Sequence, residues 1–118
     1  MIFNVDHIDN IYLVIEYVDF RKSIDGLSAI VDHHLNLKST DNSLFLFTNK
    51  RRNSIKILYY EYNGFWIFQK KLLSNEHFRW PKISQLDKVV VTKKELEWLL
   101  SGMELTPKYK FKPTKIIT

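Results

Sequence analysis

The sequence of 118 residues contains no cysteine, only three glycines and three prolines, and no long apolar run. Without cysteine, the chain has no disulfide framework and no thiolate to act as nucleophile or metal ligand. A membrane-spanning helix needs roughly 18 consecutive apolar residues, whereas the longest runs here, such as Leu44–Phe47, have the length of a strand. These absences predict a cytoplasmic protein that does not contact a membrane.

Motifs that would carry catalysis are also missing from the sequence. The three separate glycines form no phosphate-binding loop. Adjacent His33 and His34 project about 100° apart on a helix, unlike the i, i+4 pair that converges on one metal ion. Ser23 has no nucleophile-elbow motif around it, and the carboxylates are too scattered to hold two metal ions. We therefore expect no enzyme: no catalytic residue, metal site, cofactor or small-molecule substrate.

Aromatic residues and basic residues are what the chain has in abundance. Eight Phe, six Tyr and three Trp are typical of a folded protein rather than a disordered one. Eighteen Lys and Arg against thirteen Asp and Glu give a net charge of +5, which attracts polyanions. The length suits a single domain. We predict one domain over residues 1–105, followed by a basic tail or edge strand over residues 106–118.

The first third of the chain predicts a strand followed by a helix. Ile11–Val14 is short, β-branched and aromatic, as strands are. The helix is expected to begin near Asp19 as its N-cap. Gly26 lies within it, and close packing against a strand would explain a glycine there. Apolar residues spaced by four, three, four and four residues define one helical face: Phe20, Ile24, Leu27, Val31 and Leu35.

The middle of the chain predicts a three-stranded antiparallel meander. Its strands are expected at Ser43–Thr48, which is apolar on both faces and therefore central, at Ile55–Tyr62 and at Phe65–Leu72. Asn63-Gly64 is a strong hairpin signal, because both residues tolerate the positive φ of a type I′ turn. The meander is the main structural prediction.

A second helix is expected after a short strand at Lys88–Val91. It covers Thr92–Ser101 and opens with a capping box formed by Thr92 and Glu95. The predicted fold is therefore α+β, with one helix before the meander and one after it, forming a single layer of helices on the sheet.

The hairpin predicts that basic residues gather at one edge of the meander. A two-residue loop at Asn63-Gly64 would place Lys56 opposite Lys71, and antiparallel geometry brings the turn after the first meander strand to the same end. Like charges facing each other are destabilising unless a carboxylate or a bound anion offsets them. The residues predicted to contact nucleic acid are Arg21, Lys22, Lys50, Arg51, Arg52, Lys56, Lys70, Lys71 and Arg79.

Two other interpretations of these patterns stay open. Lysines and arginines at turns and strand ends are often simply solvated and discourage edge-to-edge aggregation. Exposed aromatics of the hairpin would stack on single-stranded bases, but aromatic residues in strands more often form the core. The aromatics in question are Tyr60, Tyr62, Phe65 and Trp66.

Several ordered motifs resemble one known family. Asp19–Leu27 resembles the D-x-R-K-(S/G)-x-D-G-L signature of the TnpB (Orf2) accessory protein of insertion sequences of the IS66 family. The resemblance continues through Phe78–Pro81 and Leu99–Gly102, and spans about residues 11 to 103. The positions that carry it include Asp19, Asp25, Gly26, Gly64, Trp66, Trp80 and Pro81.

The resemblance implies an accessory role in DNA transposition, beside a separate transposase that carries the catalytic carboxylates. It implies partnership with DNA, with the transposase and with other proteins of the same element. One hypothesis is a DNA-binding factor that contacts backbone phosphates through the basic residues. The alternative is an adaptor that docks the transposase through the Asp19–Leu27 motif or through an exposed Trp80 region. A third possibility is a remnant copy that folds but has no activity.

Overall fold

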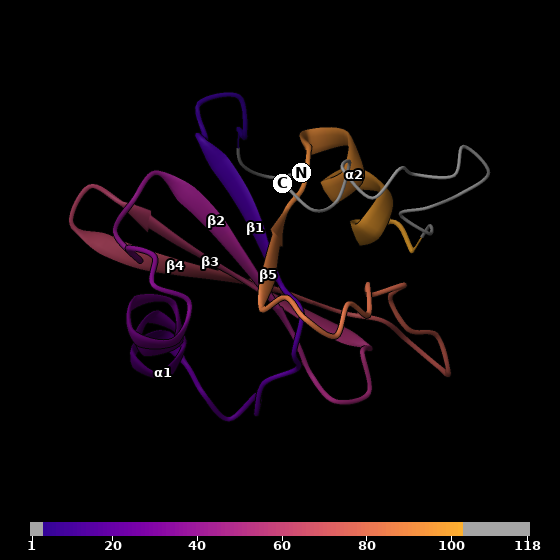
Figure 1. Ribbon diagram of the computed structural model, residues 1–118. Helices are drawn as coiled ribbons and strands as arrows, with labels where there is room; N and C mark the ends of the chain where they lie inside the picture. Colours follow the sequence, from indigo (N-terminus) through magenta and orange to yellow (C-terminus); the bar gives the residue numbers. More distant parts are fainter. Residues whose placement is uncertain (1–3, 103–118) are drawn as a thin grey trace.

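The computed structural model describes residues 4–102, which form a five-stranded sheet and two helical segments (Figure 1). The strand order across the sheet is β4-β3-β2-β1-β5. The tail predicted at residues 106–118 lies outside the described residues. The elements are β1 (Asn10–Val14), α1 (Ile24–Ala29), the π-helical turn η1 (Ile30–His34), β2 (Ser43–Thr48), β3 (Ser54–Glu61), β4 (Gly64–Lys71), β5 (Lys88–Val90) and α2 (Lys93–Leu100).

The predicted α+β class and the meander are confirmed. β2, β3 and β4 pair antiparallel in sequence order, and β2 is buried along its whole length, as a central strand should be. β1 pairs parallel with β2, so the first helix is the crossover between two parallel strands. β5 returns to the other side of β1 and pairs antiparallel with it.

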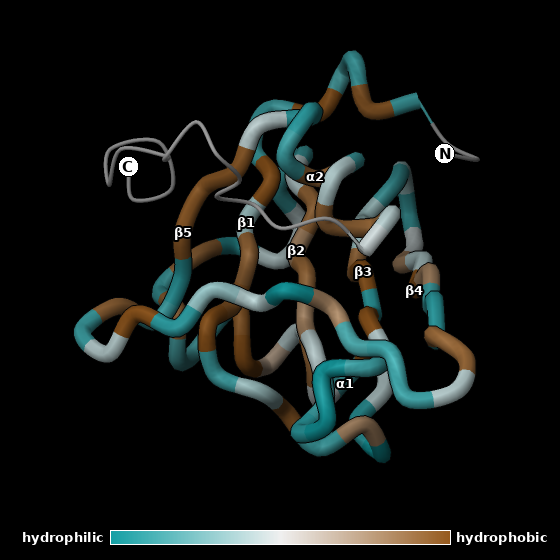
Figure 2. Tube along the Cα trace, turned by 90° about the vertical axis from the view of Figure 1, so that its right-hand side faces the viewer, coloured by the Kyte–Doolittle hydropathy of each residue, from teal (hydrophilic) through white to brown (hydrophobic). Residues whose placement is uncertain are grey.

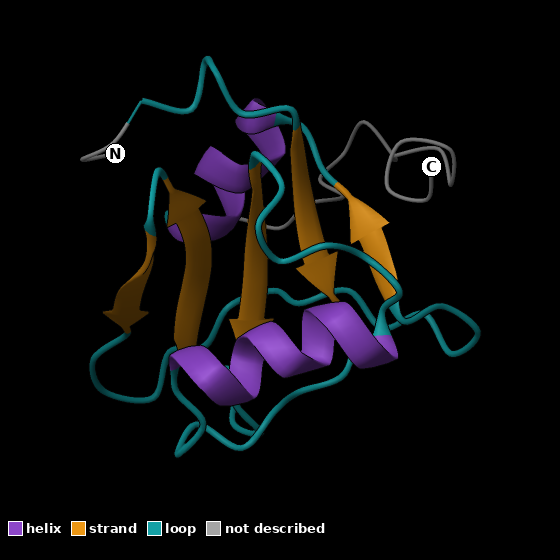
Figure 3. Ribbon diagram, turned by 90° about the vertical axis from the view of Figure 1, so that its left-hand side faces the viewer, coloured by secondary structure: helices purple, strands orange, loops and turns teal. Residues whose placement is uncertain are grey.

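The two helices cover opposite faces of the sheet, which corrects the expected single helical layer (Figure 3). Leu27 and Val31 pack with Phe45 and Phe47 on one face. Leu96 and Leu99 belong to a separate core on the other face, together with the irregular chain between β4 and β5. Figure 2 shows this irregular chain crossing in front of the sheet, below α2 in this view. Because alternate residues of β2 point to opposite faces and Leu44–Phe47 are all apolar, each face needed its own cover.

The first helix begins at Ile24, so its N-cap position lies four residues later than the sequence suggested. Asp19 instead closes a turn of its own, in which its side chain accepts a hydrogen bond from the Arg21 amide at 2.9 Å. Its carbonyl accepts another from the Lys22 amide at 3.0 Å. The N-cap position of α1 is Ser23, whose side chain makes no capping bond. The segment Asp19–Ser23 is therefore a separate turn ahead of the helix.

The β3–β4 hairpin has a different register from the predicted one. Glu61 pairs with Gly64, so the loop residues are Tyr62 and Asn63. Tyr62 takes the positive φ, 59°, and neither Asn63 nor Gly64 does, so the predicted type I′ turn on Asn63-Gly64 is wrong. A consequence is that Lys56 faces Gln69 rather than Lys71. This register separates two lysines that would otherwise repel each other.

The second helix follows its sequence signals closely. Thr92 accepts from the Glu95 amide at 3.1 Å, and the Glu95 carboxylate accepts from the Thr92 amide at 2.7 Å, which completes the predicted capping box. No helix within residues 4–102 is long and apolar enough to cross a membrane.

Candidate nucleic-acid interface

The end of the sheet at the β2–β3 turn is where several of the predicted basic residues meet. Backbone pairing brings three segments together there: the Leu72 amide donates to the Asn53 carbonyl at 2.8 Å, and the Phe78 amide donates to the Arg52 carbonyl at 2.7 Å. In Figure 1 this turn lies below the sheet, beside the chain that follows β4. We call this surface the basic end; its residues are Lys50, Arg51, Arg52, Lys71 and Arg79.

The β2–β3 turn presents its cations on a well-defined backbone. The Asn49 side chain accepts from the amides of Asn53 at 3.1 Å and Ser54 at 3.2 Å, while its own amide group donates to the Asn53 side chain at 2.6 Å. Lys50 and Arg51 project from this turn and are exposed, and neither has an ion pair or side-chain hydrogen bond within residues 4–102. Their charges are thus available to an external anion.

Lys56 does not belong to the basic end, because its side chain is buried. Only 8% of the residue is exposed. Its ammonium donates to the carbonyls of Phe20 at 2.9 Å and Lys22 at 2.8 Å, and it lies 4.8 Å from the centre of the Phe20 ring. The local sequence gives no signal of this burial, because Ile55 and Ile57 point to the opposite face of β3. The two acceptors lie more than thirty residues earlier in the chain.

Lys70 and Lys71 project to opposite faces of the sheet, as consecutive strand residues do. The Lys70 ammonium donates to the Leu100 carbonyl at 2.5 Å and so caps the C-terminal end of α2. A cation is favourable there because of the helix dipole. Lys71, paired with Ser54, is exposed and lies on the face that α1 covers. Only Lys71 of this pair remains in the candidate interface.

Arg21 and Lys22 lie in the turn ahead of α1, where Arg21 is already paired. Its guanidinium donates to both Asp19 carboxylate oxygens, with the shortest distance 2.6 Å between Nη2 and Oδ2. This pairing lowers the pKa of the Asp19 carboxyl to about 2 and raises the pKa of Arg21. Lys22 is exposed, and its ammonium makes no hydrogen bond or ion pair among residues 4–102. The turn therefore offers one unpaired cation and one neutralised by Asp19.

Two of the other positions that carry the family resemblance have structural roles. Trp80 is 5% exposed and its indole donates to the Val14 carbonyl at 2.9 Å, so an exposed Trp80 interface is ruled out. Gly26 leaves room for Lys22, because a Cβ there would lie 3.0 Å from the Lys22 Cβ rather than against a strand. Trp66 is 54% exposed, and its indole donates to Glu61 at 3.0 Å. Asp25 lies exposed in the first turn of α1, Gly64 has open space around it, and Pro81 is half-buried.

A small groove of about 260 Å³ adjoins the basic end. Arg52 forms part of its lining, and the Arg52 Nε is buried without a hydrogen-bond partner. The sequence reasoning missed Glu16 and Lys82, which also line it, because nothing in their local patterns indicates that they meet across the fold. The lining residues are Ile15, Glu16, Arg52, Pro81, Lys82, Ile83 and Ser84.

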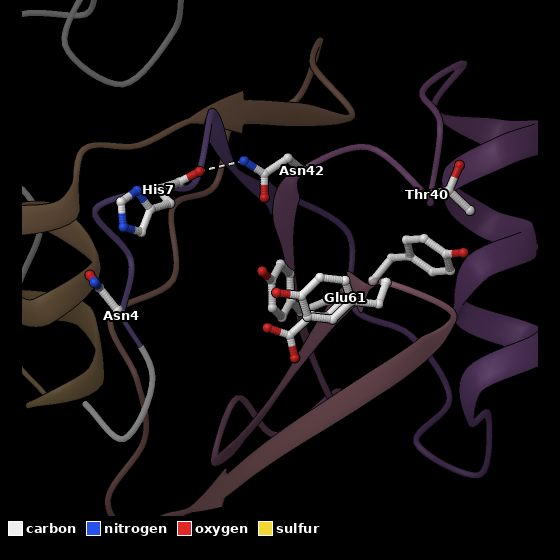
Figure 4. A pocket seen from close by; sticks show the side chains of 8 residues that line it. Asn4, His7, Thr40, Asn42 and Glu61 are labelled. Carbon is white, nitrogen blue, oxygen red and sulfur yellow. Dashed lines mark hydrogen bonds between the residues drawn. The ribbon is translucent and has the colours of Figure 1, made fainter.

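A larger pocket of about 560 Å³ lies near the opposite end of the sheet, by the β3–β4 hairpin (Figure 4). Three tyrosines and Glu61 meet polar groups from the two loops that precede β1 and β2; the Asn42 side chain donates to the His7 carbonyl. Burial is the main cause that raises the pKa of Tyr59. No lysine or arginine of the described chain lines this pocket, so it does not extend the basic end. Its lining residues are Asn4, His7, Thr40, Asn42, Tyr59, Tyr60, Glu61 and Tyr62.

The described residues contain no set of side chains that could bind a metal ion. Among residues 4–102, no three His, Asp or Glu side chains come close enough together to hold an ion. What the fold presents is a small α+β domain with a cationic surface at one end of its sheet.

Comparison with known proteins identifies the family. The model of the family described as IS66 Orf2 like protein matches residues 9–110, and the chain belongs to this family. An uncharacterized protein, y4hO of Sinorhizobium fredii, is 25% identical over 107 residues, which cover 90% of this chain and 91% of that protein. No solved structure matches significantly. Membership of the family indicates an accessory role in transposition and association with the transposase of a mobile element.

Proposed function

We propose that this protein is a non-catalytic, DNA-binding accessory factor of transposition, whose basic end contacts backbone phosphates. The observation that carries the proposal is the convergence of Lys50, Arg51 and Lys71 at one end of the sheet. All three are exposed, and none has a carboxylate partner within residues 4–102. Positively charged side chains that cluster without carboxylate partners attract a polyanion.

The proposed contacts hold the duplex without reading its sequence. Lysine and arginine bound to phosphates fix the position and orientation of a protein on DNA, while base edges carry the sequence information. The contact set is smaller than the sequence suggested, since Lys56 is buried and Lys70 caps α2. Lys22 flanks this set of contacts. Arg21 could contact a phosphate only while its guanidinium also remains paired with the Asp19 carboxylate.

Fluorescence anisotropy of a labelled DNA duplex, titrated at several salt concentrations, tests the proposal. The triple variant Lys50→Gln/Arg51→Gln/Lys71→Gln should bind more weakly than the wild type. Its log–log salt dependence should also be shallower, by about 0.9 for each phosphate that the variant no longer neutralises. The three side chains are exposed, so the variant should fold normally, which circular dichroism and the melting temperature verify.

A matched control removes the same charge elsewhere. Lys38 precedes β2, and Lys93 and Lys94 open α2, so all three lie away from the β2–β3 turn. The variant Lys38→Gln/Lys93→Gln/Lys94→Gln should retain most of the wild-type salt slope. Equal losses in the two triple variants would show that only net charge matters and would refute the assigned surface.

A second candidate function is a protein adaptor that docks the transposase. The turn Asp19–Ser23 supports it, because this part of the family signature is largely exposed. Hydrogen bonds from the buried Lys56 ammonium to two of its carbonyls hold the turn in place. A complex with the transposase that forms without DNA and survives high salt would favour the adaptor. Loss of that complex in an Arg21→Ala/Lys22→Ala variant would locate it on this turn.

A further inference from the structure

The groove at Arg52 lies just beyond the carboxyl ends of the two parallel strands of the sheet. β1 ends at Val14, directly before Ile15 and Glu16, and β2 ends at Thr48, directly before the turn that contains Arg52. Residues 81–84 close the third side. In sheets with parallel strands joined by a helix, ligands bind outside the carboxyl ends of those strands. The place of the groove in the fold is therefore one where ligands are commonly bound.

Arg52 is held in an unusual conformation at this groove. Its φ is 57°, in the left-handed region that a residue with a Cβ rarely adopts. Two backbone hydrogen bonds fix it there: the Arg52 amide donates to the Asn49 carbonyl at 3.0 Å, and the Arg52 carbonyl accepts from the Phe78 amide at 2.7 Å. Residues kept in such regions by their surroundings cluster at functional sites.

The Arg52 guanidinium also has an unmet hydrogen-bonding need. Its Nε is buried, yet it has no partner within the described residues. Buried donors are almost always paired, and a desolvated charged donor binds an anion more strongly than a solvated one. Lys82 supplies a second cation to the lining, while Ile15, Pro81 and Ile83 supply apolar walls that weaken screening.

We propose that this groove binds one phosphate group of the DNA backbone. The Arg52 guanidinium donates hydrogen bonds to the phosphate, and Lys82 supplies a second positive charge. The inference rests on the proposed DNA-binding function. It identifies Arg52, whose backbone is held in place, as a specific phosphate contact within the basic end. A backbone phosphate fits better than a carboxylate of a protein partner, because Arg52 is directly continuous with the exposed Lys50 and Arg51. Glu16 is the acidic group at the groove, and it opposes the anion.

Nuclear magnetic resonance of the arginine Nε–Hε groups provides the direct test. The buried Arg52 Nε–Hε should exchange slowly with water and give a sharp cross peak, which the Arg52→Lys variant identifies by its loss. Addition of duplex DNA should shift this peak, and inorganic phosphate at constant ionic strength should shift it in the same direction. If DNA binds while the Arg52 peak stays unmoved, the groove proposal is overturned and the basic end still stands.

Two charge-conserving variants complete the test. Arg52→Lys keeps the charge but loses the planar fork, so DNA affinity should fall about tenfold at constant salt. Arg51→Lys is the comparison on the same turn: it keeps the charge of an exposed contact, so it should lose clearly less affinity than Arg52→Lys, and Glu16→Gln should bind more tightly. Equal affinities of the two lysine variants would overturn the groove proposal. Absence of DNA binding by the wild type would overturn the proposed function itself. If phosphate shifted the Arg52 peak although DNA did not bind, the groove would instead take an acidic group of a protein partner.

Discussion

The ammonium of Lys56 donates a 2.8 Å hydrogen bond to the carbonyl of Lys22, thirty-four residues earlier in the chain. A second bond, of 2.9 Å, reaches the carbonyl of Phe20. Both acceptors belong to the turn that precedes α1, and backbone carbonyls in such a place need partners. A buried lysine of the central sheet therefore fixes the turn that presents Arg21 and Lys22. The family signature and the sheet are one structural unit.

Replacing Lys56 with methionine should loosen that unit. Methionine fills a similar volume but leaves two carbonyls without their donor, which should lower the free energy of unfolding by about 1 to 3 kcal/mol. Urea denaturation measures the loss, and hydrogen exchange should show faster exchange in residues 19–23. Lys71→Met, on the exposed end of β4, serves as control and should change stability by less than about 0.5 kcal/mol. Similar stability of the two variants would contradict the role of Lys56.

Gly26→Ala should destabilise the protein even though alanine is the better helix former. The exchange normally gains about 1 kcal/mol in a helix. Here the new Cβ would lie 3.0 Å from the Lys22 Cβ and 3.1 Å from its Cγ. The Lys22 backbone cannot move away easily because Lys56 holds its carbonyl. In a Lys56→Met background the turn can shift, so Gly26→Ala should cost less there; a double-mutant cycle by urea denaturation measures this coupling. Additive effects would show that the turn is not fixed by Lys56.

Local signals in the sequence predicted local structure well. The capping box of Thr92 and Glu95 placed the start of α2, and the two-sided apolar pattern of Ser43–Thr48 identified a central strand. The hairpin register was missed for a physical reason. The predicted and observed pairings differ by two residues along β3, and a shift of two leaves every side chain on the same face. Hydrophobic patterning could not distinguish them.

The candidate site was only partly predictable, because its groups depend on long-range contacts. The cluster of Lys50, Arg51 and Lys71 follows from antiparallel pairing and was expected. The burial of Lys56 and the bond from Lys70 to the last turn of α2 need the packing of segments thirty or more residues apart. No pattern within one element contains that information.

Asp19 should titrate far below an ordinary aspartate. Hydrogen bonds from Arg21 are the main cause that lowers its pKa from 3.8 to about 2. Because the folded-state pKa is lowered, the pair is fully formed above pH 3.8 and is lost as the pH falls through 2. Carbon-detected titration of the carboxyl group should give this midpoint, and in Arg21→Gln it should move back toward 3.8. Lys22→Gln, which keeps the Arg21 bonds, should leave it low. A wild-type midpoint near 3.8 would mean that the pair does not persist in solution.

Tyr62→Asn should stabilise the β3–β4 hairpin. Tyr62 has a φ of 59° and is 90% exposed, so it has backbone strain and little packing to offset it. Asparagine tolerates the left-handed region, and the substitution should raise the free energy of unfolding by about 0.5 to 1 kcal/mol. Urea denaturation measures the gain. Asn63→Gly is the control: it places glycine where φ is not positive, and should bring no gain. A gain at position 63 and none at 62 would favour a turn centred on Asn63-Gly64.

Lys70 and Lys71 should separate stability from DNA binding, because adjacent strand residues point to opposite faces. Lys70→Gln removes the charged partner of the Leu100 carbonyl and should lower the free energy of unfolding by about 0.3 to 1 kcal/mol, since that cation lies at the end of the α2 dipole. Its DNA affinity should change little. Lys71→Gln should leave stability unchanged and reduce the salt slope of DNA binding by about 0.9. Urea denaturation and anisotropy on both variants give the four values. If both variants lose the same DNA affinity, the interface extends over both faces of β4, and the basic end must be enlarged to include Lys70.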